Sequence, residues 1–228
     1  MDNYQILLFD ADDTLFDFSA CEEKAFQLAF RQFGYPVNRK IYKLYEGINK
    51  GLWKQYEQGR IDKNTLIYSR FALLFQEIGI QDDGILFEDV YQELLGQQHF
   101  FIDGAQEVVQ ELYKSHDLYI VTNGITQTQL RRFRDSQIDR FMKKIFVSEE
   151  TGYQKPRKEY FDYCFERIEG FDQKRTLIIG DSLSSDIRGG NNAGIATCWY
   201  NPGRHMNETD SRIDYEINDL RELLTIME

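Results

Sequence analysis

Along most of the chain, short apolar runs alternate with stretches in which apolar residues recur at helical spacing. The runs have the length and the β-branched and aromatic content of buried strands, whereas the stretches between them are typical of amphipathic helices. The predicted strands are residues 5–9, 117–121, 145–147, 176–179 and 196–199, with a sixth at 215–217 that is expected at an edge. The predicted helices are residues 104–115, 126–136, 157–168, 184–193 and 218–226. Because this alternation requires right-handed crossovers, it predicts an α/β domain with a mainly parallel sheet.

Residues 17–96 interrupt the alternation. This stretch contains no convincing strand pattern, and its apolar residues form stripes that are typical of one buried helix face. The stripe residues are Phe26, Phe30, Phe33, Phe71, Leu74, Phe75 and Ile78. Asp62 is a predicted helix N-cap. We interpret 17–96 as a helical subdomain inserted after the first strand, with 1–16 and 97–228 forming the sheet domain, and we expect the two chain crossings to act as hinges.

Two carboxylates directly follow the first predicted strand. Asp10 and Asp12 are two residues apart, so in an extended segment their side chains point the same way. One of them could attack a substrate while the other moves protons, provided that a cation offsets their repulsion. By themselves, these residues are equally consistent with a turn followed by a helix cap.

Other strand ends also carry polar side chains. Thr122 and Asn123 follow the second strand, Lys155 follows the short third strand, and Asp181 and Asp186 follow the fourth. The carboxyl ends of parallel strands meet at one edge of a sheet, where ligands of open α/β sheets bind. We therefore expect four carboxylates, one ammonium and one hydroxyl in a single crevice.

Clustered carboxylates repel one another unless a cation pairs with them. Their hard oxygen ligands suit Mg²⁺, whereas zinc is disfavoured because these segments contain no His or Cys. A phosphate dianion fits between the metal and Lys155, with Thr122 and loop amides donating hydrogen bonds to its oxygens. Asp10 can then attack phosphorus, and Asp12 can protonate the leaving oxygen and later deprotonate water.

Four short motifs occur in order along the chain. They are Asp-x-Asp-x-Thr from Asp10, Thr-Asn-Gly from Thr122, Gly-x-x-Lys-Pro around Lys155, and Gly-Asp-Ser-x-x-x-Asp, which contains Asp181 and Asp186. This ordered set resembles the four motifs of the haloacid dehalogenase superfamily of hydrolases. The resemblance implies a Rossmann-like core and a helical cap, inserted between the first and second motifs, that closes over the site.

The resemblance also implies roles for these residues. Asp10 would be the nucleophile and a metal ligand, and Asp12 the acid/base, with its backbone carbonyl also touching the metal. Thr122 and Lys155 would hold the phosphoryl group. The implied Mg²⁺-binding residues are Asp10, Asp12, Asp181 and Asp186, the last either as a ligand or through water.

One position departs from the superfamily pattern. Most members carry Gly after the second Asp, whereas this chain carries Asp13. Both this form of the motif and the segment from Thr197 to Pro202 resemble a bacterial subgroup of pyrimidine 5′-nucleotidases. Strand alternation predicts that Asp13 points away from Asp10 and Asp12 and caps or braces the hinge. The carboxylate of Asp12 itself favours phosphate-ester hydrolysis, because the dehalogenase branch lacks it.

The composition of the chain limits the classes of ligand and the location that we expect. The formal net charge of −11 argues against nucleic acid as a ligand, and no apolar run approaches the length of a membrane span. Three widely spaced cysteines match no disulfide or zinc pattern, and the N-terminus has no signal segment. We expect a cytoplasmic monomer or homodimer that acts on a small phosphorylated substrate.

The expected reaction is Mg²⁺-dependent hydrolysis of a phosphate monoester, with a nucleoside 5′-monophosphate as the expected substrate. Asn123 and Trp53 are additional candidates for substrate binding, since a nucleobase could stack on Trp53, although ordinary helix packing also explains this tryptophan. Three alternatives stay open: a sugar-phosphate phosphatase, a phosphomutase, and a non-catalytic binding protein on the same fold.

Overall fold

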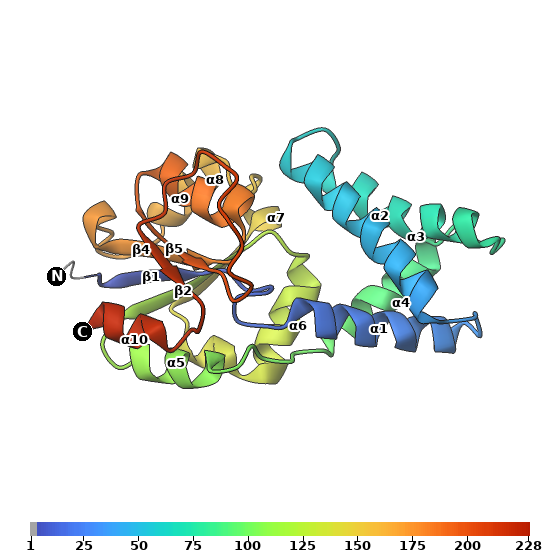
Figure 1. The fold of residues 1–228 in the computed structure, drawn as a ribbon, viewed down its shortest axis with the longest axis horizontal. Coiled ribbons are helices and arrows are strands. Elements are labelled where there is room, and N and C mark those ends of the chain that lie inside the picture. The colour runs from blue at the N-terminus through green and yellow to red at the C-terminus, as the bar shows by residue number, and fades with distance from the viewer. Residues whose placement is uncertain (1–3) are drawn as a thin grey trace. The chain divides into compact units, whose positions relative to one another are not determined.

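The computed structural model describes residues 4–228 and divides the chain into two compact units. One unit comprises the N-terminal residues through Phe18 together with His99–Glu228, and the other is Ser19–Gln98. The first unit contains the sheet, and the second is helical (Figure 1). Each unit has its own core and is described separately below.

The sheet has six strands in the order β3-β2-β1-β4-β5-β6, and every neighbouring pair is parallel. The strands are β1 (Ile6–Phe9), β2 (Asp117–Thr122), β3 (Lys144–Val147), β4 (Thr176–Gly180), β5 (Ala196–Tyr200) and β6 (Tyr215–Ile217). Strand β6 lies at an edge, as expected. This topology confirms the predicted α/β class with a Rossmann-like parallel sheet.

The helices of the sheet unit cover both faces of the sheet (Figure 1). They are α5 (Ala105–Leu112), α6 (Thr126–Ser136), α7 (Ser148–Thr151), α8 (Lys158–Phe165), α9 (Arg188–Ala193) and α10 (Glu222–Met227), with 3₁₀ turns η1 (Ile138–Phe141) and η2 (Gln173–Arg175) and a π-helical turn η3 (Leu183–Ile187). Leu7 and Phe9 pack on the face with α5, α6 and α10, whereas Ile6 and Leu8 pack on the face with α8 and α9. The alternation of side chains along β1 therefore builds two separate cores.

The helices predicted at 104–115 and 157–168 end three residues earlier than expected, at Leu112 and Phe165, and two other predicted helices differ more. The helix predicted at 184–193 is a π-helical turn followed by the shorter α9. The helix predicted from residue 218 begins only at Glu222, because the Glu222 carboxylate accepts hydrogen bonds from the backbone N–H groups of Asn218 and Asp219. These local bonds hold residues 218–221 in a turn.

The helical unit contains α1 (Phe18–Gln32, whose first residue belongs to the sheet unit), α2 (Arg39–Glu57), α3 (Lys63–Ile78) and α4 (Ile85–Gly96). Its core is aromatic: Phe26 stacks on Phe30 at 4.3 Å, and Tyr45 stacks on Phe71 at 5.0 Å between ring centroids. Phe26, Phe30 and Phe71 belong to the stripes predicted from helical spacing, whereas Tyr45 was not among the predicted residues. Asp62 caps α3 by accepting a hydrogen bond from the Thr65 N–H at 2.8 Å, which confirms the predicted N-cap.

The two chain crossings are paired where they leave the sheet unit. Phe16 forms an antiparallel bridge with Phe101, and the Ile102 N–H donates to the Leu15 carbonyl at 2.9 Å. Asp13 has a φ of 60° and accepts a hydrogen bond from the N–H of Phe18, the first residue of α1, at 3.0 Å. The positive φ explains why glycine suits this position, and the hydrogen bond confirms the bracing contact that we expected of Asp13.

Candidate active site

Asp10 lies at the carboxyl end of β1 and is largely buried. Its backbone N–H donates to the Ile179 carbonyl of β4 at 2.9 Å, so the main chain is held within the sheet. Burial, followed by the charge of Asp186, raises the pKa of Asp10 to about 8, while Lys155 opposes this rise. A carboxylate in this environment requires a nearby cation to stay ionised at neutral pH.

Lys155 supplies one such cation. Its Nζ donates to Asp10 Oδ1 at 2.6 Å, to Asp186 Oδ1 at 2.7 Å and to the Val121 carbonyl at 2.8 Å. The side chain is 1% exposed, and burial alone would lower the pKa of Lys155. The two carboxylates outweigh burial and hold the pKa of Lys155 above its ordinary value. The ammonium is therefore a fixed positive charge between β1 and the loop after β4.

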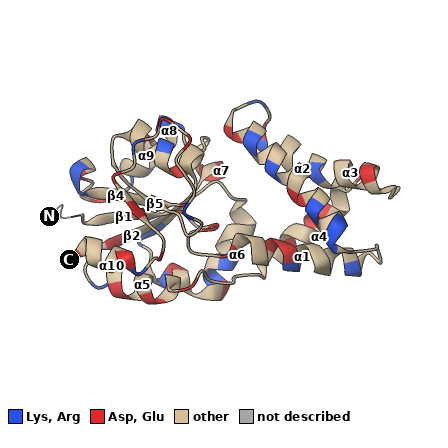
Figure 2. Cartoon of the chain, in the orientation of Figure 1, with Lys and Arg blue, Asp and Glu red and all other residues tan. Residues whose placement is uncertain are grey.

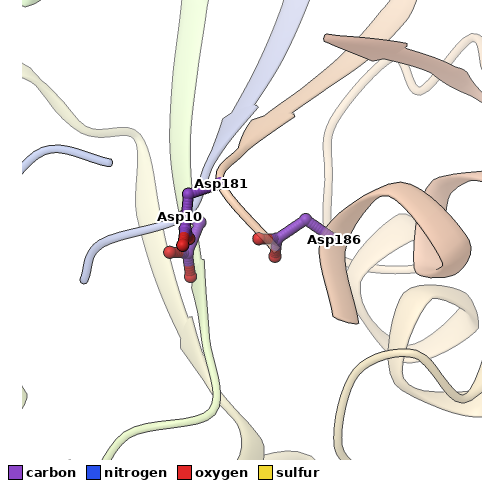
Figure 3. Close-up of side chains that lie close together, drawn as sticks. All are labelled: Asp10, Asp181 and Asp186. Carbon is purple, nitrogen blue, oxygen red and sulfur yellow. The ribbon is translucent and has the colours of Figure 1, made fainter. Parts of the chain in front are cut away.

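Asp181 and Asp186 complete an acidic cluster with Asp10. One carboxylate oxygen from each of the three residues lies within 4.8 Å of the others, and the carboxyl groups point toward a common region (Figure 3). Burial, and then the charges of Asp10 and Asp186, raise the pKa of Asp181 well above its ordinary range. Lys155 contacts the carboxylates of Asp10 and Asp186 but not that of Asp181. This set of oxygen ligands fits a divalent cation of the Mg²⁺ type.

Close packing at the end of β4 positions Asp186. This residue belongs to η3 and is buried, and its Oδ2 accepts a hydrogen bond from the Ser182 N–H at 3.1 Å. A Cβ on Gly180 would lie 2.3 Å from the Asp186 carboxyl carbon, so only glycine leaves space for this carboxylate. Trp199 on β5 fixes the neighbouring loop by donating to the Asp181 carbonyl at 2.8 Å.

Asp12 is oriented differently from the cluster. Its side chain is 27% exposed, and it pairs with two residues of α6. Arg132 Nη1 donates to Asp12 Oδ1 at 2.5 Å, and Gln129 Nε2 donates to Oδ2 at 3.0 Å. Sequence reasoning missed both α6 residues. The available signal was their spacing, because Gln129 and Arg132 share the helix face of the buried Phe133.

The loop after β2 contributes Thr122 and Asn123. Thr122 Oγ1 accepts hydrogen bonds from Gln129 Nε2 at 2.9 Å and from the Gly124 N–H at 3.1 Å, so its own hydroxyl hydrogen can be donated to a ligand. Asn123 directly follows Thr122 in this loop. Its side chain bridges the Lys155 backbone, with Nδ2 donating to the carbonyl at 3.0 Å and Oδ1 accepting from the N–H at 2.9 Å. Asn123 therefore supports Lys155.

Trp53 lies in the other unit, on α2. It is half-buried and packs edge-on against Tyr56 at 5.7 Å between ring centroids. This contact is ordinary helix packing within the unit. The structure thus brings Asp10, Asp12, Thr122, Lys155, Asp181 and Asp186 together in the sheet unit, whereas Trp53 belongs to a separate body.

The chain is similar to known proteins over nearly its whole length. The family model described as haloacid dehalogenase-like hydrolase matches residues 7–200, which include all four motifs. The chain belongs to the haloacid dehalogenase-like hydrolases. It is 46% identical to the HAD-hydrolase YfnB of Bacillus subtilis, over 100% of this chain and 97% of that protein. A crystal structure of YfnB bound to magnesium matches with a TM-score of 0.95, covering 99% of each chain.

Two other relatives in this family carry named activities. The pyrimidine 5′-nucleotidase PynA of Streptococcus pneumoniae is 38% identical, over 99% of this chain and 95% of that protein. The pyrimidine 5′-nucleotidase YjjG of Escherichia coli is 28% identical, over 95% of each chain. Family membership together with these relatives supports classification of the chain as a phosphoric monoester hydrolase.

Proposed function

We propose that the protein is a Mg²⁺-dependent phosphatase that hydrolyses a nucleoside 5′-monophosphate through an aspartyl-phosphate on Asp10. The observation that carries this proposal is the convergence of Asp10, Lys155, Asp181 and Asp186 at the carboxyl edge of the sheet. A nucleophile, a fixed ammonium and a set of carboxylate ligands are thereby held within one small region.

In the proposed reaction, Asp10 forms the covalent bond to phosphorus and Asp12 transfers the protons. A carboxylate oxygen of Asp10 attacks phosphorus, the bond from phosphorus to the ester oxygen breaks, and Asp12 gives its proton to the departing oxygen. The ionised Asp12 then takes a proton from water, which attacks the phosphorus of the aspartyl-phosphate. Inorganic phosphate leaves and Asp10 is regenerated.

Positive charge around the phosphoryl group comes from two sources. As negative charge spreads over the phosphoryl oxygens, Lys155 would exchange one of its three Nζ hydrogen bonds for a bond to a phosphoryl oxygen. The Thr122 hydroxyl would donate a further hydrogen bond. Asp10, Asp181 and Asp186 would hold Mg²⁺, together with the Asp12 backbone carbonyl expected from the family pattern. The ion would neutralise phosphoryl charge and orient the group for attack.

The choice of a nucleotide rests on the subgroup. PynA and YjjG are named pyrimidine 5′-nucleotidases, and Asp13 and the segment from Thr197 resemble that subgroup. We assign residues 17–96 as the cap that selects the rest of the substrate, with Trp53 as a base-stacking candidate. A panel of nucleoside monophosphates, sugar phosphates and phosphoamino acids, with phosphate release as the readout, tests this assignment. A ranking led by pyrimidine nucleotides supports it, and one led by hexose phosphates contradicts it.

The nucleophile is tested by Asp10→Asn. The amide cannot attack phosphorus, so turnover of p-nitrophenyl phosphate with saturating Mg²⁺ should fall by about 10³-fold or more, with the fold retained. Asp162→Asn on the exposed face of α8 is the matched control and should keep parental turnover. Parental activity in Asp10→Asn would remove the aspartyl-phosphate mechanism.

A further inference from the structure

Helix α6 presents a buried polar clamp to Asp12. Arg132 is fully buried, and the Asp12 carboxylate receives one hydrogen bond on each oxygen from Arg132 and Gln129. These two helix residues lie more than a hundred positions from Asp12 in the chain. Each Asp12 oxygen keeps a second lone pair for a proton.

Several contacts hold the clamp rigid. The Arg132 guanidinium lies over the Phe16 ring at 4.7 Å and near the Phe18 ring at 5.7 Å, and Arg132 Nη1 also donates to Gln129 Oε1 at 2.7 Å. Gln129 in turn donates to Thr122 Oγ1 at 2.9 Å. A Cβ on Gly124 would lie 2.5 Å from Gln129 Cγ, so glycine is required beside the clamp.

We propose that Arg132 and Gln129 are positioning residues that orient the Asp12 carboxyl group for proton transfer. This role rests on the proposed phosphatase reaction, in which Asp12 must place a proton on the ester oxygen as the bond from phosphorus to that oxygen breaks. Because Arg132 is buried and faces Asp12, it acts through Asp12 rather than on the phosphoryl group. A rotatable carboxylate would spend part of its time away from the leaving oxygen, and the clamp removes that freedom.

The same geometry would suit a merely structural ion pair that fastens α6 to the loop after β1. The two roles differ in how the effect of a substitution depends on the leaving group. A nitrophenolate departs without protonation, whereas the alkoxide of a nucleotide or sugar phosphate needs an acid. If Arg132 and Gln129 position Asp12, their substitution should slow cleavage of the bond to the leaving group only when that leaving group needs a proton.

The test compares Arg132→Met and Gln129→Met with the parent on both substrate types, using the full chain and saturating Mg²⁺. For a nucleoside 5′-monophosphate, or for a sugar phosphate if the panel ranks it higher, kcat/KM should fall by about 10- to 100-fold. For p-nitrophenyl phosphate, kcat/KM of Arg132→Met should stay within about threefold of the parent, because Asp12 is not needed until the water step. Gln129→Met also removes the donor to Thr122 Oγ1, so its kcat/KM should fall on both substrates but clearly more for the nucleotide. The kcat for p-nitrophenyl phosphate should fall, because hydrolysis of the aspartyl-phosphate becomes slower. The first turnover should then release nitrophenol in a burst before the slower steady state.

Gln129→Met and Arg134→Met separate an effect on positioning from effects on folding or charge. Gln129→Met replaces a neutral side chain and leaves the buried charges intact, so it reports the effect if Arg132→Met folds poorly. Arg134→Met, on the exposed side of the same helix, removes the same charge and should match the parent on both substrates. Equal losses of kcat/KM on both substrates, or no loss on either, would contradict the positioning role but would leave the phosphatase proposal intact. A parent that hydrolyses neither substrate overturns the phosphatase proposal and this role with it.

Discussion

At the scale of single residues, the candidate site contains buried charges that depend on one another for pairing. Lys155 pairs with both Asp10 and Asp186 in a buried setting. Taking away one partner of such a network leaves the others desolvated and unpaired, which costs more than the pairing itself contributes. The same argument explains why Gly180 and Asn123 matter although neither is charged, since they hold Asp186 and Lys155 in place.

Lys155→Met should lower kcat/KM for p-nitrophenyl phosphate by about 10²- to 10³-fold, because a donor to the phosphoryl oxygens is lost. The melting temperature in the absence of Mg²⁺ should also fall, since two carboxylates lose their cation. Calorimetry with and without Mg²⁺ measures this effect, and Lys158→Met on the exposed face of α8 is the control. A variant as active as the parent would remove Lys155 from the mechanism.

The cysteines should be inert in the native protein. Cys21, Cys164 and Cys198 are all buried, and burial raises the pKa of Cys164 to about 12. At pH 8 the Cys164 thiol is therefore neutral in the folded state, and the thiolate is the reactive form. A disulfide reagent at pH 8 should label no cysteine until urea unfolds the chain. Fast labelling of Cys164 under native conditions would contradict this prediction.

The raised pKa of Cys164 also makes the stability of the folded protein depend on pH. The Cys164 pKa is raised on folding, so its contribution to stability is complete below the unfolded value of about 8.5. That contribution is lost as the pH rises from there through about 12. Urea unfolding at pH 8 and pH 10 should therefore show lower stability at the higher pH, and Cys164→Ala should reduce the difference.

At the scale of elements, ion pairs with a buried basic side chain join neighbouring segments in both units. In the sheet unit, α6 fastens to the loop after β1 through Arg132 and Asp12. In the helical unit, Arg70 of α3 donates two hydrogen bonds to Glu88 of α4, at 2.7 and 2.6 Å, with both side chains buried.

Glu88→Gln should destabilise the helical unit by about 3 kcal/mol, because it leaves the buried Arg70 charge uncompensated. Hydrogen exchange of α3 and α4 amides measures this locally, and Glu77→Gln on the exposed face of α3 is the control. Protection factors unchanged from the parent in both helices would show that Arg70 is stabilised by its other contacts, such as Asn49.

At the scale of the whole molecule, the chain is acidic, and Lys155 is a buried positive charge among the carboxylates of the candidate site. The net charge is −11, and residues of both signs are scattered along the helices of each unit (Figure 2). In the part of the chain that the structure describes, no helix has the length and apolarity to cross a bilayer. An acidic surface does not attract anionic substrates over a distance, so in the proposed reaction recognition of a phosphate ester would depend on Lys155 and Mg²⁺.

Mg²⁺ should stabilise the protein through the sheet unit. At a concentration 100 times the dissociation constant, the gain is about 2.7 kcal/mol for an ion that binds only the folded state. Thermal unfolding measures the shift, and hydrogen exchange should locate the added protection at the ends of β1 and β4. Asp181→Asn should abolish the shift, whereas Asp162→Asn should preserve it. A full shift in Asp181→Asn would exclude this carboxylate from the metal site.

The sequence by itself determined which residues end the strands of the sheet. The strand periods of β1, β2 and β4 are local patterns, and the rule that parallel strands meet at one edge is general, so Asp10, Thr122 and Asp181 could be assigned to one region without coordinates. Likewise, the spacing of Phe26 and Phe30 was sufficient to predict a helix with a buried aromatic face.

Only the tertiary structure decided which side chains touch. The pairing of Lys155 with Asp186, the space at Gly180 and the clamp of Gln129 and Arg132 on Asp12 join segments that are distant in sequence. Such contacts depend on which helix face turns inward and on distances of a few ångströms, and no local period encodes either. The π-helical turn that carries Asp186 also differs from the ordinary helix that the sequence predicts, and in it the Asp186 carboxylate lies against Gly180 at the end of β4.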